Sequence, residues 1–317
     1  MATTSASWKT SSSGEKVEQS GVCAQSYIDE STAFRQDAPI NAMSVDVEEH
    51  FQVSAFANRI AKREWHDLPS RVSRNVDRIL KIFDETDTKA TFFTLGWVAE
   101  RAPDLIKTIV AEGHEIASHG YDHMRVGAQT REEFLVDVFR TKKILEDISA
   151  ERVVGYRAPS FSIGEKTLWA YEALQKAGYQ YSSSIYPIKH DHYGFPSAPR
   201  FPFRFSPDGL LEIPLTTMVA AGRNWPGGGG GYFRLLPMAY SRWVLRRVNS
   251  VEKMPVTFYF HPWELDPDQP RVSGIPLSSK FRHYVNLGRF ERRLTDILRE
   301  FRWGRMDEVY GDALSIN

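Results

Sequence analysis

Short apolar runs alternate with segments of helical spacing along most of this sequence, and this alternation restricts the fold more than any other feature. Runs typical of buried strands cover residues 40–46, 89–95, 115–118, 152–156, 211–215 and 256–260. Helical spacing or helix-end signals mark residues 72–83, 102–113, 131–148, 165–177, 235–248 and 289–301. Strands that alternate with helices in this way favour a parallel α/β sheet or barrel.

The composition allows a large core but indicates no charged partner. The chain has 317 residues, 42% of them hydrophobic, which suits one large α/β domain or two medium ones. Its 40 Lys and Arg balance 40 Asp and Glu, so the net charge gives no argument for nucleic acid or an anionic membrane as a partner. Cys23 is the single cysteine, which excludes an intramolecular disulfide and a cysteine-based metal site.

Residues 1–37 are rich in Ser, Thr, Gln and charge, and we predict a mobile tail there. We expect one domain over residues 38–317, ending in a helical extension. The sequence has no signal-peptide core and no apolar span of about 20 residues, so we expect no transmembrane segment and a cytoplasmic protein.

Two irregular stretches, residues 186–209 and the glycine run 227–231, are expected to be substrate-facing loops. The glycine run lacks the Gly-Lys-Ser/Thr ending of a phosphate-binding loop.

Four polar clusters follow four of the predicted strands at their carboxyl ends. They read DVEEH from Asp46, SHGYDH around His119, RAPSF from Arg157 and HPWE from His261. In a parallel barrel the carboxyl ends of the strands converge on one rim. We therefore expect these clusters to lie close together despite their distance along the chain.

Two histidines and two acids in these clusters predict a metal centre. His119 and His123 are four residues apart, which lets two imidazoles face one cation from a turn or a first helical turn; the alternative is a chance spacing among nine histidines. Asp46 and Glu48 flank Val47, so both carboxylates point the same way on an extended strand end. One is expected to bind the metal and the other to take a proton from water, unless they cap the following helix.

Arg157 and His261 are the remaining candidates for chemistry. Arg157 stands two residues before Pro159, which sets a rigid turn beside a fixed guanidinium; a surface salt bridge is the alternative. His261 follows a strongly apolar run that delivers it to the rim, where it is expected to protonate a leaving amine. The alternative for His261 is an ordinary core or surface histidine.

With these motifs in place, the chain resembles the polysaccharide deacetylase (NodB-homology, carbohydrate esterase 4) family. Within that family it is similar to the exopolysaccharide-locus branch associated with the PEP-CTERM/exosortase system. The resemblance runs from about Ile40 to the C-terminus and rests on the stretches SVDVEEHFQVSAF, EGHEIASHGYDH, GYRAPSFSI, GGGGGYFRLLP and FYFHPWELDP. It implies a single-domain, distorted (β/α) barrel, usually of seven strands, and a divalent metal, commonly zinc.

The resemblance also implies roles for individual residues. Asp46 matches the catalytic base and Arg157 the arginine that orients it. His119 and His123 match the two metal histidines, and Glu48 fits the third ligand. His261 matches the general acid, and the backbone N–H of Ser160 stands where the family helps to hold the oxyanion. We expect Phe161 and Trp263 to form an apolar wall around the acyl methyl group and the sugar face.

Three departures from the family pattern bear on these roles. The second of two adjacent aspartates, which usually binds the metal, is Val47 here, so Glu48 takes the ligand position one residue later. An aspartate that usually tunes the acid histidine is missing from the stretch Tyr181-Ser182-Ser183-Ser184, which leaves Asp191 and Asp266 as candidates. The usual tyrosine after the Arg-x-Pro step is Ser160.

The expected function is metal-dependent removal of an N-acetyl group from an N-acetylated sugar or exopolysaccharide precursor. One alternative is a C–N hydrolase acting on another small amide or a formylated lipid-linked sugar. A second alternative is a carbohydrate-binding protein without catalysis on the same scaffold, for which Val47 and Ser182 give some support. The sequence does not determine the oligomeric state.

Overall fold

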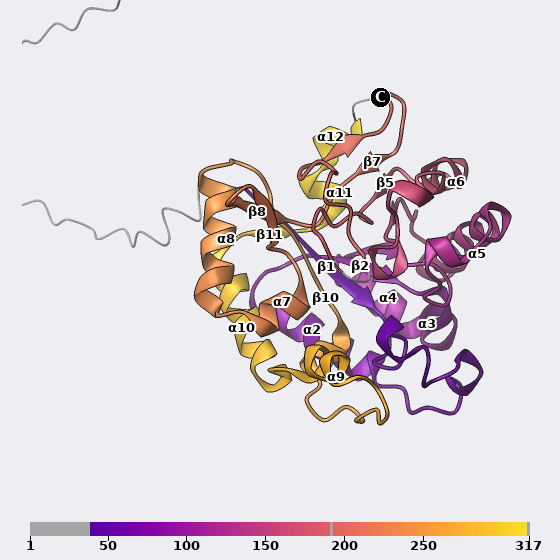
Figure 1. Ribbon diagram of the computed structural model, residues 1–317. Coiled ribbons are helices and arrows are strands. Elements are labelled where there is room, and N and C mark those ends of the chain that lie inside the picture. Colours follow the sequence, from indigo (N-terminus) through magenta and orange to yellow (C-terminus); the bar gives the residue numbers. More distant parts are fainter. Residues whose placement is uncertain (1–38, 191–192, 316–317) are drawn as a thin grey trace, which may run out of the picture.

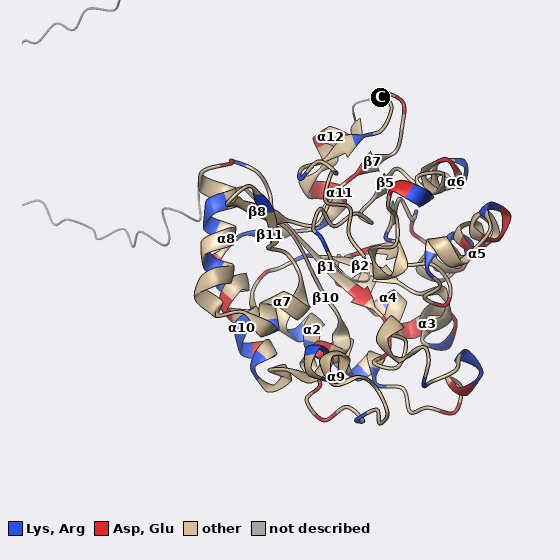
Figure 2. Cartoon of the chain, viewed as in Figure 1, with Lys and Arg blue, Asp and Glu red and all other residues tan. Residues whose placement is uncertain are grey.

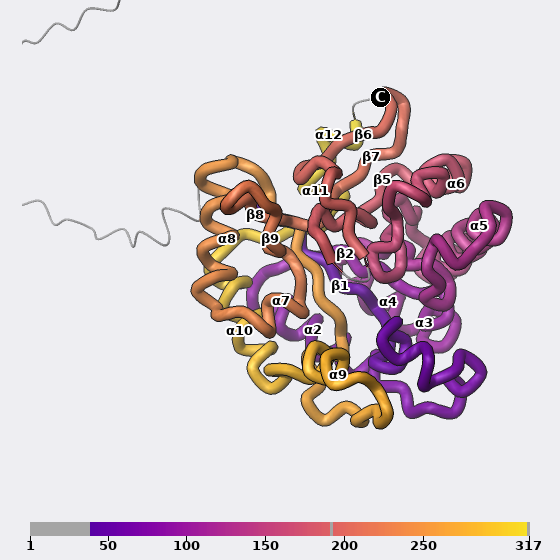
Figure 3. The backbone as a smooth tube through the Cα atoms, in the orientation of Figure 1, coloured from indigo at the N-terminus to yellow at the C-terminus, as the bar shows by residue number. Residues whose placement is uncertain are grey.

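The structure, a computed structural model, describes residues 39–190 and 193–315. The predicted tail over residues 1–37 and the candidate Asp191 lie outside these residues. Figures 1 and 3 show a curled sheet surrounded by helices, with α11 and α12 across one end of it. This arrangement confirms the predicted α/β class.

The curled sheet contains nine strands in the described part of the chain. Seven of them follow the order β10-β1-β2-β3-β4-β5-β7 and run parallel, β6 pairs antiparallel with β7, and β11 pairs with the first residues of β1. The strands are β1 (Asn41–Val47), β2 (Thr91–Thr94), β3 (Glu115–Ser118), β4 (Gly155–Tyr156), β5 (Tyr181–Ser182), β6 (Phe203–Arg204), β7 (Leu211–Glu212), β10 (Thr257–Phe260) and β11 (Trp303–Gly304). The expected number of seven barrel strands stays a prediction.

An irregular segment, residues 215–229, bridges the gap between β7 and β10. The N–H of Thr257 donates to Oγ1 of Thr216 over 2.7 Å, and the N–H of Tyr259 donates to the carbonyl of Gly228 over 2.9 Å. The segment contains a separate hairpin of β8 (Thr217–Ala220) and β9 (Arg223–Pro226). The barrel is therefore distorted where the glycine run stands in for a regular strand.

Helices cover the outer face of the sheet (Figure 1). They are α2 (Val72–Glu85), α3 (Gly96–Arg101), α4 (Pro103–Ala111), α5 (Arg131–Ser149), α6 (Ala170–Lys176), α7 (Gly230–Leu235), α8 (Met238–Ser250), α9 (Leu277–Tyr284) and α10 (Leu287–Glu300). The remaining helices, α11 (Met306–Val309) and α12 (Gly311–Ser315), lie across one end of the sheet. In α2 the apolar side chains that predicted the helix are all buried against the sheet. A capping box between Thr130 and Glu133 fixes the start of α5.

Two helix predictions need correction. The helix expected over 235–248 is divided into α7 and α8, because Pro237 lacks the N–H that a continuous helix needs. The helix expected over 165–177 begins as a 3-10 turn, Glu165–Thr167, before α6.

The prediction of a substrate-facing loop at the glycine run, residues 227–231, is also wrong. Gly228 and Gly229 are buried against β10, and Gly230 begins α7.

The two faces of the strands have different surroundings. On β1, Met43, Val45 and Val47 belong to the large core between sheet and helices. The inner face has its own apolar group, in which Met306 and Tyr310 of α11 and its C-cap close the amino end of the barrel; its other buried members are Ala42, Phe93, Ala117, Tyr181, Leu211 and Ile213. The alternation of side chains along β1 directs Asp46 and Glu48 to the inner side, at the carboxyl end.

Charged residues of both signs lie on the helices outside the sheet. Figure 2 shows both signs of charge on the outer helices α5, α6 and α10. In the described residues, none of the helices combines the length and the apolar character needed to cross a membrane.

Candidate active site

A buried ion pair joins the ends of β1 and β4 inside the barrel. Nη1 of Arg157 lies 2.6 Å from Oδ1 of Asp46, and 0% and 2% of the two residues are exposed. Nη1 also donates to Oγ of Ser44, while Nε and Nη2 donate to the carbonyl and Oγ of Ser183, at 2.9–3.0 Å. The guanidinium is therefore fixed between β1 and the residue that follows β5, and Oδ2 of Asp46 is the oxygen that does not contact it.

Glu48, His119 and His123 meet beside this ion pair. One ligand atom from each of the three residues lies within 4.8 Å of the others. Oε2 of Glu48 is 3.0 Å from Nε2 of His123, yet it has no hydrogen-bond partner among the described residues. A buried carboxylate oxygen without such a partner, facing two imidazoles, fits a divalent cation. The three predicted metal ligands are thus brought together.

Neighbouring groups orient these ligands. The imidazole Nδ1 of His119 lies 2.9 Å from the carbonyl of Arg157, which leaves Nε2 for a metal. The indole N–H of Trp263 donates to Oε1 of Glu48 over 3.2 Å. Such contacts fix the rotamer and tautomer of metal ligands.

The protonation states also suit a metal. Burial lowers the pKa of His119 to about 4, so its imidazole is neutral near pH 7. Burial raises the pKa of Glu48, but the imidazoles of His123, His261 and His119 outweigh it and bring the pKa to about 2. The set therefore presents a neutral histidine and a carboxylate anion, as a divalent cation requires.

His261 faces the same centre from the end of β10. Its Nε2 lies 4.0 Å from Oδ2 of Asp46 and 3.6 Å from Oε1 of Glu48, while its Nδ1 lies 2.9 Å from Oε1 of Glu264. Burial lowers the pKa of His261, but the hydrogen bond to Glu264 and the nearby carboxylates raise it above its ordinary value overall. Nε2 of His261 thus faces the carboxylates of Asp46 and Glu48, while Glu264 holds Nδ1.

Of the two candidates for polarising His261, Asp266 has other partners, and Asp191 stays a prediction. Asp266 binds Arg71 through both its oxygens and Arg74 through one, at 2.5–2.9 Å, and Asp191 lies outside the described residues. Glu264 makes the contact instead. Its role was missed, although its position three residues after His261 in the HPWE cluster was a visible signal. Arg234, which binds Glu264, had no such signal in the sequence.

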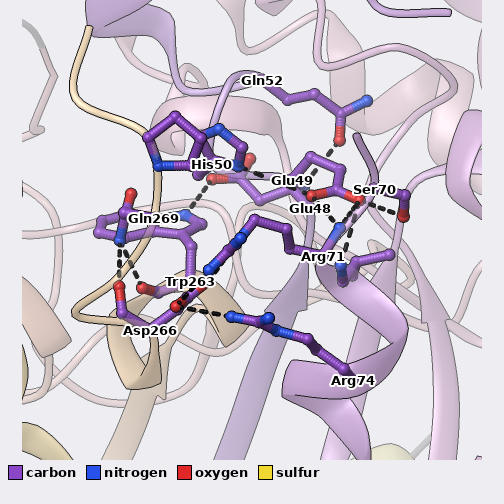
Figure 4. Close-up of polar contacts among 12 residues, drawn as sticks. Glu48, Glu49, His50, Gln52, Ser70, Arg71, Arg74, Trp263, Asp266 and Gln269 are labelled. Carbon is purple, nitrogen blue, oxygen red and sulfur yellow. Dashed lines mark hydrogen bonds and ion pairs between the residues drawn. The ribbon is translucent and has the colours of Figure 1, made fainter. Parts of the chain in front are cut away.

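A second group of contacts holds the loops after β1 and β10 against α2 (Figure 4). Oε1 of Glu49 accepts from Oγ of Ser70 and from the N–H groups of Arg71 and Val72 at the start of α2. Arg71 in turn binds Asp266, in the loop after β10. The loop that carries Glu48 and the loop that follows His261 are thus tied to one helix end.

The three residues predicted to bind substrate, Ser160, Phe161 and Trp263, contact different groups. Ser160 and Phe161 have left-handed backbone angles, with φ of 54° and 48°, and Oγ of Ser160 lies 2.7 Å from Oγ of Ser54. Phe161 packs on Tyr259, with ring centroids 4.7 Å apart. Trp263 is 5% exposed and stacks between His261 and His283. Trp263 is therefore in contact with catalytic and metal-binding candidates, and its part in a substrate wall stays a prediction.

Comparison with known proteins agrees with this geometry. The sequence model of the polysaccharide deacetylase family matches residues 65–182, and one described as a domain of unknown function (DUF3473) matches residues 183–311. The peptidoglycan deacetylase of Helicobacter pylori is 28% identical over 140 residues, which are 42% of this chain and 47% of that protein. The chain spans about half or less of the length of the first curated relatives that it matches.

Two solved structures share the fold. One, from Mycobacterium smegmatis and provisionally described as a polysaccharide deacetylase, has a TM-score of 0.55 and 20% identity, covering 86% of this chain and 89% of that one. The other, Puue allantoinase, has a TM-score of 0.55 and 16% identity, covering 89% and 93%. These similarities confirm the distorted barrel and, with the family match, the predicted resemblance. The exosortase-associated branch stays a prediction.

Proposed function

Because residues 65–182 match the polysaccharide deacetylase family, we propose that this chain is a metal-dependent hydrolase that removes N-acetyl groups from N-acetylated sugars. The observation that carries the proposal is the meeting of Glu48, His119 and His123 beside the Asp46–Arg157 pair and His261. This set combines metal ligands, a buried carboxylate and a histidine, which are the groups that amide hydrolysis needs.

The three proposed metal ligands determine what a bound cation would contribute to the reaction. Glu48, His119 and His123 would hold it, and a divalent cation in such a set polarises a carbonyl oxygen and makes water more acidic. Two imidazoles and one carboxylate favour zinc among the common metals, and we propose zinc on that ground.

Asp46 is proposed as the general base. Arg157 occupies Oδ1, so Oδ2 is the oxygen that accepts a proton from the attacking water. The water oxygen forms a bond to the acyl carbon while its proton moves to Oδ2. The backbone N–H of Ser160 is proposed to donate to the oxyanion that results.

His261 is proposed as the general acid. Its Nε2, which faces Asp46 and Glu48, delivers a proton to the sugar nitrogen as the C–N bond breaks. The products are acetate and a free amine, so water supplies the oxygen and the protons that the reaction needs. Phe161 is proposed to line the acyl site with its aromatic ring.

The test is acetate release by purified protein, loaded with zinc, from a panel of N-acetylated oligosaccharides. The panel includes N-acetylglucosamine oligomers, an exopolysaccharide fragment, a formylated sugar and a small amide. Acetate from the oligosaccharides supports the proposal. Formate release without acetate, or hydrolysis of the small amide alone, would favour the other C–N hydrolase, and no turnover with any substrate would contradict the proposal.

A further inference from the structure

His261 has a buried carboxylate partner that the family pattern does not supply. Nδ1 of His261 lies 2.9 Å from Oε1 of Glu264, and the N–H of His261 donates to the same oxygen over 3.1 Å. Glu264 is fully buried. The aspartate that usually serves the acid histidine is replaced by Ser182, whose hydroxyl donates to Oγ of Ser184 instead.

Arg234 of α7 holds the second oxygen of this carboxylate. Its Nε donates to Oε2 of Glu264 over 2.6 Å, and only 2% of Arg234 is exposed. Its Nη1 donates to the carbonyls of His283 and Val285 and its Nη2 to that of Arg282, at 2.8–3.1 Å. Each nitrogen of the guanidinium therefore has a fixed acceptor, which makes Glu264 a rigid acceptor for His261.

The glycine run allows this arrangement. A Cβ at Gly230 would overlap with the carboxylate of Glu264, and a Cβ at Gly228 would overlap with the carbonyl of Thr257. A Cβ at Gly229 would lie 2.7 Å from the ring of Tyr259. Only glycine lets the start of α7 approach β10 closely enough for Arg234 to reach Glu264.

All of these parts lie in residues 183–311, the region that matches a domain of unknown function. Asp46, Glu48, His119 and Arg157 lie outside that region. The catalytic centre is thus divided along the sequence, with the base and the metal ligands in the first part and the acid in the second.

We propose that Glu264, held by Arg234, is the positioning residue for the acid His261, and that residues 183–311 supply this half of the catalytic centre. Glu264 keeps a proton on Nδ1, so that Nε2 faces Asp46 and delivers its proton to the leaving nitrogen. The inference rests on the proposed function for its chemistry, whereas the tautomer of His261 is a property of the protein alone.

Glu264→Gln tests the role with little change in shape. Arg234 offers only donors, so it takes the amide oxygen of the glutamine and turns the NH2 group toward Nδ1 of His261. The backbone N–H of His261, which donates to Oε1 of Glu264 in the wild type, then loses its acceptor. Nδ1 must then accept a hydrogen bond, which removes its proton. The matched control is Asp266→Asn, two residues away, because Asp266 is also a buried carboxylate bound by arginine but does not contact His261.

The kinetic arm compares two leaving groups in the zinc-loaded enzyme. A sugar amine leaves only when it is protonated, whereas the nitrophenolate of p-nitrophenyl acetate leaves as an anion. For Glu264→Gln we expect kcat on diacetylchitobiose to fall by about 100-fold or more, with KM little changed and the aryl ester much less affected. Asp266→Asn should keep the wild-type ratio of the two rates. Equal losses on both substrates, or an unchanged amide rate, would overturn the proposal.

The spectroscopic arm does not depend on activity. Protein labelled with 15N-histidine reports whether Nδ1 of His261 carries a proton, and His261→Gln identifies the signal. We expect a protonated Nδ1 in the wild type and in Asp266→Asn, and an unprotonated Nδ1 in Glu264→Gln. The same Nδ1 state in all three proteins would refute the positioning role even if no substrate were turned over. Absence of acetate release by the wild type, with the expected tautomers, would instead contradict the proposed function alone.

Discussion

Arg157 reaches Asp46 from β4 across the interior of the barrel, and the 2.6 Å contact between Nη1 and Oδ1 is closed to solvent. Asp46 is the charged partner of Arg157, because the ring of Phe93, 4.0 Å from the guanidinium, adds only a weaker attraction. Removing one member of a buried pair leaves the other as an uncompensated charge. The pair therefore couples the proposed base to the stability of the barrel.

Asp46→Ala should lower both stability and turnover. The unpaired guanidinium should cost ~3–5 kcal/mol of unfolding free energy, measured by chemical denaturation. Asp46→Asn keeps an acceptor for Arg157, so it should cost less while still reducing kcat by about 100-fold or more. Bound metal, measured by elemental analysis, should be retained in both variants. Full activity of either variant with metal in place would exclude Asp46 as the base.

His119→Ala should lose metal and activity together. The variant removes one of the three ligands that lie within 4.8 Å of one another, and added zinc should not restore wild-type turnover. His66→Ala is the control, because His66 is an exposed histidine whose ring contacts Arg101. It should keep both metal and turnover. Stoichiometric metal in His119→Ala would show that His119 is not a metal ligand.

Much of the site was predictable because parallel strands place their carboxyl ends on one rim. Asp46, His119, Arg157 and His261 each follow an apolar run, so their convergence followed from the alternation of strands and helices. Other parts depend on contacts that no local pattern marks. Arg234 comes from a helix that begins in the glycine run, and only the packing of α7 on β10 brings it to Glu264.

Two further features could not be predicted from the sequence alone. The strand β5 has two residues in a serine-rich stretch, and it exists because β4 and β7 pair with it on both sides. The 3-10 turn over Pro262–Leu265 directs the indole N–H of Trp263 to Glu48, and no pattern in the sequence indicated this contact.

Ser160→Gly should leave turnover nearly intact, since the proposed donor is the backbone N–H. The left-handed backbone at φ 54° is easy for glycine, and this relief should offset the lost contact with Ser54. We expect an unfolding free energy within ~1 kcal/mol of the wild type. Ser160→Val places a β-branched side chain in the same conformation and should cost ~1–3 kcal/mol. A large loss of kcat in a stable Ser160→Gly variant would show that the hydroxyl, not the backbone, is needed.

Glu212 should make stability depend on pH. It is fully buried and accepts the N–H groups of Ser184 and Ile185, and burial raises its pKa from 4.5 to about 7. Between these values the unfolded chain releases the proton while the native state keeps it, so this contribution to stability is complete below pH 4.5 and is lost as pH rises to 7.

Glu212→Gln removes this dependence. Between pH 4.5 and 7, the unfolding free energy of the variant should rise relative to that of the wild type by ~3 kcal/mol, at about 1.4 kcal/mol per pH unit. Urea denaturation at several pH values measures it. All other groups titrate in both proteins, so parallel stability curves would mean that Glu212 ionises normally.

Gly230 and Gly231 offer a comparison between neighbours in the same helix. A Cβ at Gly230 would overlap with the carboxylate of Glu264, whereas a Cβ at Gly231 meets no atom within 4 Å. Gly230→Ala should therefore displace Glu264 from His261, costing ~1–3 kcal/mol of stability and lowering kcat on the amide more than on the aryl ester. Gly231→Ala should instead raise stability by up to ~1 kcal/mol, because alanine favours the helix, and should keep the wild-type ratio of rates. Thermal unfolding and the two-substrate assay measure both effects. Similar behaviour of the two variants would mean that the glycine run is not needed to seat Glu264.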